Sequence, residues 1–426
     1  MSTSRILVAV SVGVLGCTDL SALAQSASGG GLGGGPPGAR SDRTKREIRR
    51  ARFENAFGPN DTHRFGDPLA DLTEEEWDRF LTGRALFEDV KSAAAGLGPA
   101  YVARSCTGCH SAPVSAGAGE SALVRVTRRE ADVAVYSAES GLETRPIGDD
   151  CDNAGEQRQG LFAVRSTTAV FGAGLIDAIS DYAILFGEDP DDLDGDGISG
   201  RAHIVSDPYE GVARVGRFGW KAQAATLESF TADSLELHLG ITTRLTAHQE
   251  GVPGHSASVL NDCDSVEDPE DAPDAANVSD FERIADYLRL LAAPPQRNQN
   301  NTLGLTLFQR IGCTGCHTAV MFTDSSDIES LSRRAVALYS DLLLHDMRGS
   351  GDGIVQAGAG ANEMRTAPLW GLRARPALWH DGRFNAETRV RDAIEAHDGE
   401  GTASRDSWLA LPDTQQRALL EFLNSI

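Results

Sequence analysis

Two short motifs of identical pattern carry the clearest chemistry in this chain of 426 residues. Each has two cysteines separated by two residues and a histidine directly after the second cysteine: Cys106-Thr-Gly-Cys109-His110 and Cys313-Thr-Gly-Cys316-His317. One turn of chain places both thiols along one porphyrin edge and brings the next imidazole beneath the metal, as in c-type haem sites. The spacing therefore predicts two covalently bound haem c groups, with His110 and His317 as iron ligands.

Two other chemistries use similar cysteine pairs, namely zinc sites and thioredoxin-like dithiols. A zinc site would need further Cys or His pairs at ligand spacing, and the sequence has none. A redox dithiol would need a βαβ setting, which neither motif has. Haem is therefore the interpretation that we carry forward.

The first residues are typical of an export signal. Arg5 precedes an apolar run over 6–16, too short to span a bilayer but suited to a signal peptide. We favour cleavage after Ala24, so that residues 1–24 are removed and the protein is periplasmic. The alternative is a lipobox ending at Cys17, which would leave a lipid anchor on a membrane-attached lipoprotein. No later segment is long and apolar enough for a transmembrane helix.

Composition limits the partners. The formal net charge is -23, which argues against nucleic acid, because phosphate binding needs a basic face. The acidity favours cationic partners. Residues 25–60 are rich in Gly, Pro and Ser at their start and are predicted to be a flexible linker.

The rest of the chain repeats itself once. A helix is predicted before the first haem motif, since Thr73 and Glu76 form a capping box ahead of an apolar face. Related segments occur in both halves, in the same order: Gly83–Phe87 and Gly304–Phe308, then Thr167–Gly172 and Thr366–Gly371, then the helix-like stretches Phe281–Leu291 and Gln415–Leu423. This order of first helix, haem motif, loops and closing helix predicts a mainly α fold. We expect two cytochrome c-like haem domains with long loops, at residues 61–292 and 293–426.

Two cysteines remain after the haem motifs and Cys17. Cys151 and Cys263 each lie beside Asp in polar segments. In an oxidising compartment they would form one disulfide. Two exposed free thiols are the alternative, and sequence gives no distance between them.

Several stretches resemble the bacterial diheme oxidoreductases, a family related to the diheme cytochrome c peroxidases and to the enzyme that matures methylamine dehydrogenase. The resemblance covers almost the whole mature chain, and its motifs fall in order across both halves. The matching stretches are Gly96-Leu-Gly-Pro, Ala103-Arg-Ser-Cys106, Asp194-Gly-Asp-Gly-Ile-Ser-Gly-Arg201, Gly216-Arg-Phe-Gly-Trp-Lys221, Tyr339-Ser-Asp-Leu-Leu-Leu-His-Asp-Met347, Arg365-Thr-Ala-Pro-Leu-Trp-Gly371 and His380-Asp-Gly-Arg383. The resemblance implies a two-domain cytochrome fold, but a fold does not prove a reaction.

The resemblance also implies a second ligand for the C-terminal haem. His397 follows the helix-like stretch Glu387–Ala396, at the place where relatives carry Met or Tyr. We predict that His317 and His397 bind one iron, which would lower its potential relative to Met ligation. Met347 and Met364 are the competing ligands.

The N-terminal haem is expected to be the reactive one. By resemblance, Trp220 is the relay between the haems, and a downstream acidic residue acts in proton transfer. His238 stands where relatives carry that acid, with Glu236 two positions earlier. His238 is therefore a distal ligand that caps the iron, a proton shuttle, or a surface histidine.

An acidic loop resembles a calcium site. Asp192, Asp194 and Asp196 alternate, with Gly at the tight turn. His203 occupies the twelfth position, where a calcium loop has Glu. A calcium ion and an acidic turn without metal both fit this pattern.

Together these features predict an exported diheme c-type oxidoreductase. It would reduce hydrogen peroxide at the N-terminal haem with electrons relayed through the C-terminal haem, supplied by a small redox protein such as a cytochrome c or cupredoxin. Two alternatives remain open. One is a non-enzymatic diheme electron-transfer protein, and the other is an enzyme that oxidises a protein or organic substrate through a high-valent haem.

Overall fold

The computed structural model describes residues 63–119, 161–246, 266–297 and 301–426, with five short strands between residues 121 and 146. All of them belong to one compact unit, Arg52–Ile426. The predicted signal peptide and linker, with Cys17, lie outside the described residues, as do Cys151 and Cys263. Among the described residues, no helix has the length and apolar character needed to cross a membrane.

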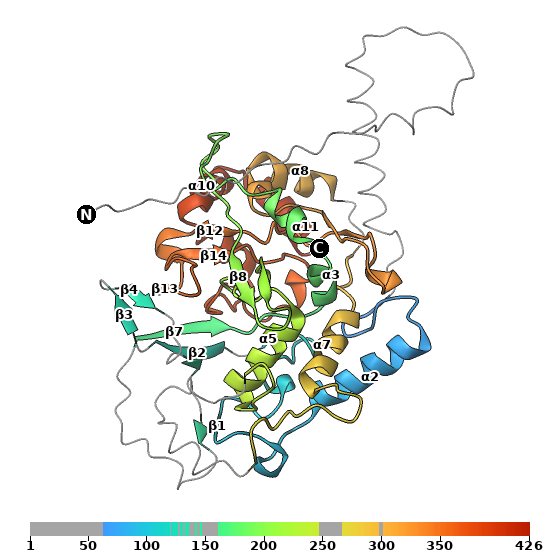
Figure 1. Ribbon diagram of the computed structural model, residues 1–426. Helices are drawn as coiled ribbons and strands as arrows, with labels where there is room; N and C mark the ends of the chain where they lie inside the picture. Colours follow the sequence, from blue (N-terminus) through green and yellow to red (C-terminus); the bar gives the residue numbers. More distant parts are fainter. Residues whose placement is uncertain are drawn as a thin grey trace, which may run out of the picture. The chain divides into compact units, whose positions relative to one another are not determined.

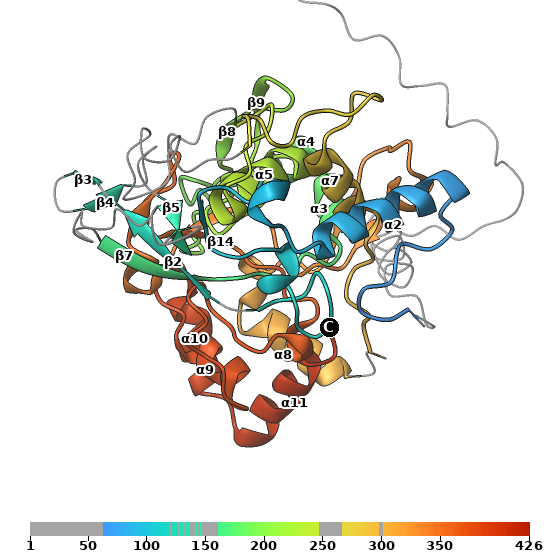
Figure 2. The ribbon, with the colours of Figure 1, turned by 90° about the horizontal axis from the view of Figure 1, so that it is seen from below.

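The first helix of the N-terminal half packs on its closing helix. These are α2 (Glu74–Glu88) and α7 (Asp280–Leu290), which lie side by side in both views (Figure 1, Figure 2). The predicted capping box is present, since Thr73 and Glu76 bond each other's main-chain amides at the start of α2. At the crossing, a Cβ on Gly83 would lie 2.0 Å from the carbonyl oxygen of Arg283, so only glycine permits this approach.

The C-terminal half repeats this arrangement with α8 (Thr302–Arg310) and α11 (Asp413–Leu423). Here a Cβ on Gly304 would lie 2.4 Å from the carbonyl oxygen of Ala418. Gly83 and Gly304 are thus equivalent crossing points, as the repeated segments predicted. The pairing of first and closing helices is confirmed in both halves.

The second repeated segment also has matching geometry. Gly172 and Gly371 both have a left-handed backbone, with φ of 71° and 70°. Each begins a short helix, α3 (Ala173–Asp177) and η8 (Leu372–Ala374). The two segments meet, because a Cβ on Gly172 would contact the Trp370 ring at 2.8 Å.

Helices exceed strands among the described residues, but the mainly α prediction is confirmed only in part. Small sheets of two or three strands occupy the loops, and the longest pairing joins β2 to β7. The remaining helices are α4 (Asp181–Leu185), α5 (Leu227–Ser234), the π-helix η4 (Leu235–Leu239), α9 (Arg389–Glu395) and α10 (Thr402–Leu409), with the one-turn helices η1 (Ala93–Ala95), η2 (Cys106–Gly108), η5 (Cys313–Gly315), η6 (Glu329–Leu331), η7 (Arg348–Ser350) and η9 (Gly399–Gly401). The strands are β1 (Ala100–Tyr101), β2 (Ser121–Val126), β3 (Arg128–Glu130), β4 (Val133–Val135), β5 (Gly141–Leu142), β6 (Arg145–Pro146), β7 (Leu161–Ser166), β8 (Ile204–Asp207), β9 (Val212–Val215), β10 (Met321–Phe322), β11 (Ala335–Val336), β12 (Leu344–Asp346), β13 (Ile354–Val355) and β14 (Glu363–Arg365).

Two apolar cores support the two helix pairs. The larger contains Phe87 and Tyr287, whose rings pack 5.3 Å apart, and it also takes in Trp370 from the second half of the chain. The smaller contains Phe308 and Phe422, 5.6 Å apart. Phe87 and Phe308, the last residues of the Gly-x-x-x-Phe repeats, also contact the histidine of the haem motif in their own half.

Candidate functional site

The two Cys-x-x-Cys-His motifs adopt the same local structure. The first cysteine of each motif begins a one-turn helix, η2 or η5, and the second cysteine directly follows that helix. The amide of His110 donates to the carbonyl of Cys106 at 2.8 Å, and that of His317 donates to Cys313 at 2.9 Å. Each motif is therefore closed into one turn that holds both thiols close to the following imidazole, as covalent haem attachment requires.

Four imidazoles share one hydrogen-bonding arrangement, in which Nδ1 donates to a main-chain carbonyl. A carbonyl only accepts, so Nδ1 carries the hydrogen and the Nε2 lone pair is left for a metal. The donor and acceptor pairs are His110 to Gly117 at 3.1 Å, His317 to Tyr339 at 3.0 Å, His238 to Ser234 at 3.0 Å and His397 to Ala393 at 2.7 Å.

All four imidazoles are kept neutral near pH 7. Burial lowers the pKa of both His110 and His317 to about 4, and it lowers the pKa of His238 and His397 as well. A neutral imidazole is the form that binds iron. The environment of each ring therefore favours the ligand form over the charged form.

The structure brings the predicted second histidine of the C-terminal half to the histidine of its haem motif. The ring centres of His317 and His397 are 6.5 Å apart. An imidazole nitrogen binds a transition metal at about 2 Å, so rings on opposite sides of one iron have centres about 6 Å apart. In the other half, the charge of His238 contributes to the lowered pKa of His110, after burial.

A large cavity surrounds the second motif, and its open space, including the mouth, measures about 1570 Å³. Cys313, Cys316, His317 and His397 all line it. This set of two thiols, two opposed imidazoles and a wide apolar space fits a covalently attached porphyrin. The competing ligands Met347 and Met364 line the same cavity.

The cysteines themselves do not favour the alternative chemistries. Burial raises the pKa of Cys106 and of Cys313 to about 12. Reactive dithiols have thiol pKa values below the ordinary one, so these thiols differ from a redox pair. Among the described residues, the group whose side chains converge as metal ligands is made of aspartates and contains no cysteine.

Comparison with known proteins agrees with this geometry. The sequence profile of the family described as "Di-haem oxidoreductase, putative peroxidase" matches residues 147–426, more than half of the chain. The chain belongs to this family. The matched residues contain the second haem motif, while the first motif precedes them.

The other comparisons add little information about this di-haem oxidoreductase. Curated protein sequences include no match. Among solved structures it is similar to hydrazine synthase from Kuenenia stuttgartiensis, with 13% identity and a TM-score of 0.40, over 86% of this chain and 91% of the other. That likeness is too weak to bear on function.

The predicted catalytic residues of this di-haem oxidoreductase divide between the two sites. Trp220 lines the cavity of the second motif, and its Nε1 donates to the carbonyl of Ser166 at 2.9 Å. Glu236 lies with His238 on the π-helix η4 of the first site. Burial, together with the charges of Asp233 and Asp268, raises the pKa of Glu236 to about 7.

His345, which was not predicted as a site residue, also lies beside the second motif. It is buried between two carboxylates, with Nδ1 2.6 Å from Glu400 and Nε2 3.0 Å from Asp341. Burial would lower its pKa, but the hydrogen bonds to Asp341, Cys316 and Glu400 raise it to about 12. This charged imidazole lies 3.5 Å from the sulfur of Cys316. Its position within the family stretch ending at Met347 was the available signal.

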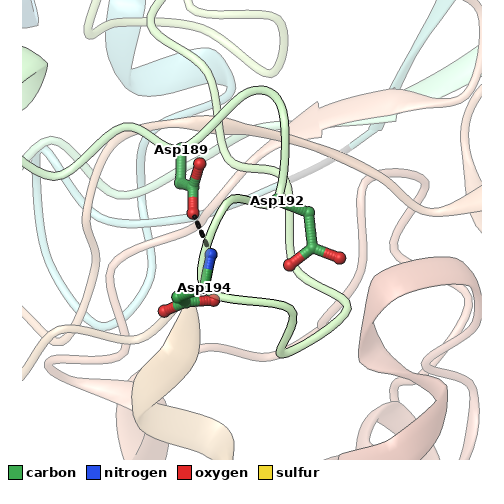
Figure 3. Close-up of side chains that lie close together, drawn as sticks. All are labelled: Asp189, Asp192 and Asp194. Atoms are coloured by element: carbon green, nitrogen blue, oxygen red, sulfur yellow. Dashed lines mark hydrogen bonds between the residues drawn. The ribbon is translucent and has the colours of Figure 1, made fainter.

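The acidic loop differs in detail from the predicted calcium ligands. Carboxylate oxygens of Asp189, Asp192 and Asp194 lie within 4.8 Å of one another (Figure 3). Asp189 was not among the predicted residues, and Asp196 is not in this group; its carboxylate accepts from the amide of Ile198. His203 does not complete this group as a ligand, because both of its ring nitrogens bond main-chain carbonyls.

Proposed function

We propose that this protein is an exported diheme c-type oxidoreductase that reduces hydrogen peroxide at the N-terminal haem. The C-terminal haem would supply electrons to it. The observation that carries the proposal is the duplicated Cys-x-x-Cys-His turn, which in the C-terminal half lies beside a second neutral imidazole, that of His397. The duplicated helix pairs and crossing glycines support two cytochrome c-like haem domains, at residues 61–292 and 293–426.

The residues that would hold the two haems follow from the sites. Cys106 and Cys109 would form the thioethers of the first haem, with His110 on its iron. For the second haem we propose thioethers from both cysteines of its motif and axial bonds from His317 and His397. When bound, haem iron supplies the redox centre at which a peroxide can be reduced.

Peroxide reduction consumes two electrons and two protons and yields two water molecules, so the site must move protons. A proton-transfer group works best with a pKa near the working pH. Glu236, with its pKa raised to about 7, fits that requirement. The Nε2 atom of His238 would hold the iron at rest or pass the proton between the two oxygens. Trp220 would relay electrons from the cavity of the second motif.

A second candidate is a diheme protein that only transfers electrons. In its favour, the charge of His238 acts on His110, as expected if both imidazoles bound one iron and left no open position. In the enzyme, His238 must leave the iron or never bind it. In the carrier, it stays bound throughout turnover.

Further parts of the proposal concern partners and ions. We propose a small cationic redox protein as electron donor, in keeping with the net charge of -23. We also propose a periplasmic location. Asp189, Asp192 and Asp194 would bind a calcium ion, for which clustered carboxylate oxygens are suitable ligands.

Rapid mixing of the fully reduced protein with hydrogen peroxide tests the function. The enzyme should oxidise both haems with one equivalent of peroxide and turn over when donor is supplied. Glu236→Gln should slow that oxidation by about 100-fold at pH 7. Two reduced haems that stay unchanged under excess peroxide would exclude the enzyme and favour the carrier.

A further inference from the structure

Three buried polar atoms in the cavity of the second motif have no hydrogen-bond partner among the described residues. They are Nδ1 and Nε2 of His380 and Nε1 of Trp379. His380 is only 6% exposed, and both side chains line the cavity that also contains His317. Buried polar groups are normally satisfied, so these atoms indicate a polar partner inside the cavity.

The buried Arg365 and the half-buried Arg375 line the same cavity. Within the described residues, the side chains of Arg365 and Arg375 donate to main-chain carbonyls. Neither forms an ion pair with a carboxylate of the described residues. Burial lowers the pKa of Arg365 and of Arg375 to about 10; the charge of Arg375 contributes to the lowered value of Arg365, and that of Asp341 opposes it. Two guanidiniums that line one cavity without an ion pair call for anions beside them.

We infer that Arg365, Arg375, Trp379 and His380 bind the two propionate carboxylates of the haem attached through Cys313 and Cys316. We call these four residues the propionate seat. The inference rests on the proposed function, because it requires haem in this cavity. The chemistry matches, since two guanidiniums neutralise two carboxylates and the indole and imidazole N–H groups donate to the remaining oxygens.

The propionate seat lies next to Trp220, the proposed electron relay. The rings of His380 and Trp220 have centres 6.5 Å apart, and the amide of Arg365 donates to the carbonyl of Trp220 at 2.9 Å. Carboxylates held by these residues would therefore lie on the Trp220 side of the cavity. Electrons leaving the second haem for the other site would depart on this side.

The seat also contacts the second ligand. Trp379 packs on the ring of His397 with centres 5.3 Å apart, and its φ is 85°, a strained value for a residue with a side chain. The indole packs against His397, while its N–H has no hydrogen-bond partner among the described residues. One residue thereby links carboxylate binding to the position of the axial imidazole.

Arg375→Gln tests the seat, with Arg373→Gln as the matched control. Arg373 is two residues away but does not line the cavity; it donates to the carbonyl of Pro295 and lies over the ring of Phe65. The readouts are the intact mass, the resonance Raman propionate-bending band and the midpoint potential of each haem. Arg375→Gln should shift the band and lower the potential of the second haem alone, because a cation that favours the reduced state is lost. Arg373→Gln should change neither.

His380→Phe provides a second test in case Arg375→Gln does not fold. It keeps an aromatic ring beside Trp220 but removes both nitrogens, and it should shift the same Raman band. An unchanged band and potential in a variant that retains both haems would overturn the seat. A saturable spectral change on adding formate to the wild-type protein would also overturn it, since the seat would then take a free anion. Absence of covalent haem would instead refute the proposed function.

Discussion

The two haem-binding halves share their framework and differ at the second imidazole. Both have a glycine at the helix crossing, a closed Cys-x-x-Cys-His turn and Nδ1 bonded to a carbonyl. His397 follows the regular helix α9, and its ring packs on Trp379. His238 lies in the π-helix η4, which ends at Gly240 with a left-handed backbone.

This difference bears on how each iron would be used. π-Helices are rare and are frequently found at functional sites. Near η4, burial raises the pKa of Glu236 and of Glu270 to about 7. Beside the second motif, the carboxylates instead hold His345 in its charged form. We expect the first site to exchange ligands and protons and the second to keep its ligands and pass electrons.

Removing the second imidazole of either site should have the largest effect on spectra and turnover. His397→Gly should convert the second haem from low to high spin and raise its potential, because a strong neutral donor is lost. Turnover should fall by about 10- to 100-fold while peroxide still binds at the first haem. His238→Gly should instead alter peroxide binding or O–O cleavage. Electron paramagnetic resonance of the oxidised variants separates the two outcomes, and a wild-type spectrum for His397→Gly would assign the ligand to Met347 or Met364.

The crossing glycines test whether the halves share a framework. Gly83→Ala and Gly304→Ala should each lower the free energy of unfolding by about 2–4 kcal/mol, because the new methyl group meets a carbonyl oxygen. The loss should be larger at Gly83, where the approach is 2.0 Å rather than 2.4 Å. Gly187→Ala is the control, since its Cβ would meet its nearest atom at an ordinary 3.5 Å. Chemical denaturation of the haem-loaded proteins provides the measurement, and equal stability of all three variants would contradict the shared crossing.

Substitution of Glu236 should have the smallest effect, on the pH dependence of stability, and it tests whether this carboxyl holds a proton in the folded protein. Its pKa is about 7 in the folded protein and near 4.5 when unfolded, so the folded state binds more protons between these values. Wild-type stability should therefore fall as pH rises from about 5 to 8. Glu236→Gln should remove about 1–2 kcal/mol of that fall, allowing for its partial exposure. Denaturation at pH 5 and pH 8 measures this, and an unchanged pH dependence would show that Glu236 is not buried as a neutral acid.

Local sequence patterns predicted the framework well. The capping box at Thr73, the helix pairs and the position of His397 beside His317 all followed from spacing or resemblance. These features depend on residues close in sequence or on repeated segments, so one half helps to interpret the other. The short strands were missed, because pairs of two or three residues carry no readable alternation.

Contacts between distant segments could not be predicted. The raised pKa of His345 depends first on Asp341, four residues earlier, but also on Glu400, which lies 55 residues later in the chain. In the propionate seat, Arg365 and Arg375 line the same cavity as His380, and no periodic pattern in the sequence indicates that cavity. Likewise, Asp189 joins the acidic cluster because the loop turns back on itself, which spacing counted from Asp192 did not show.

Intact mass spectrometry of the protein purified from the periplasm tests the central claim most directly. We predict the mass of the mature chain plus two haems. Peptide mapping should place one haem on Cys106 and Cys109 and the other on Cys313 and Cys316. A chain without haem mass, or one that carries zinc with four free thiols at these positions, would contradict the account.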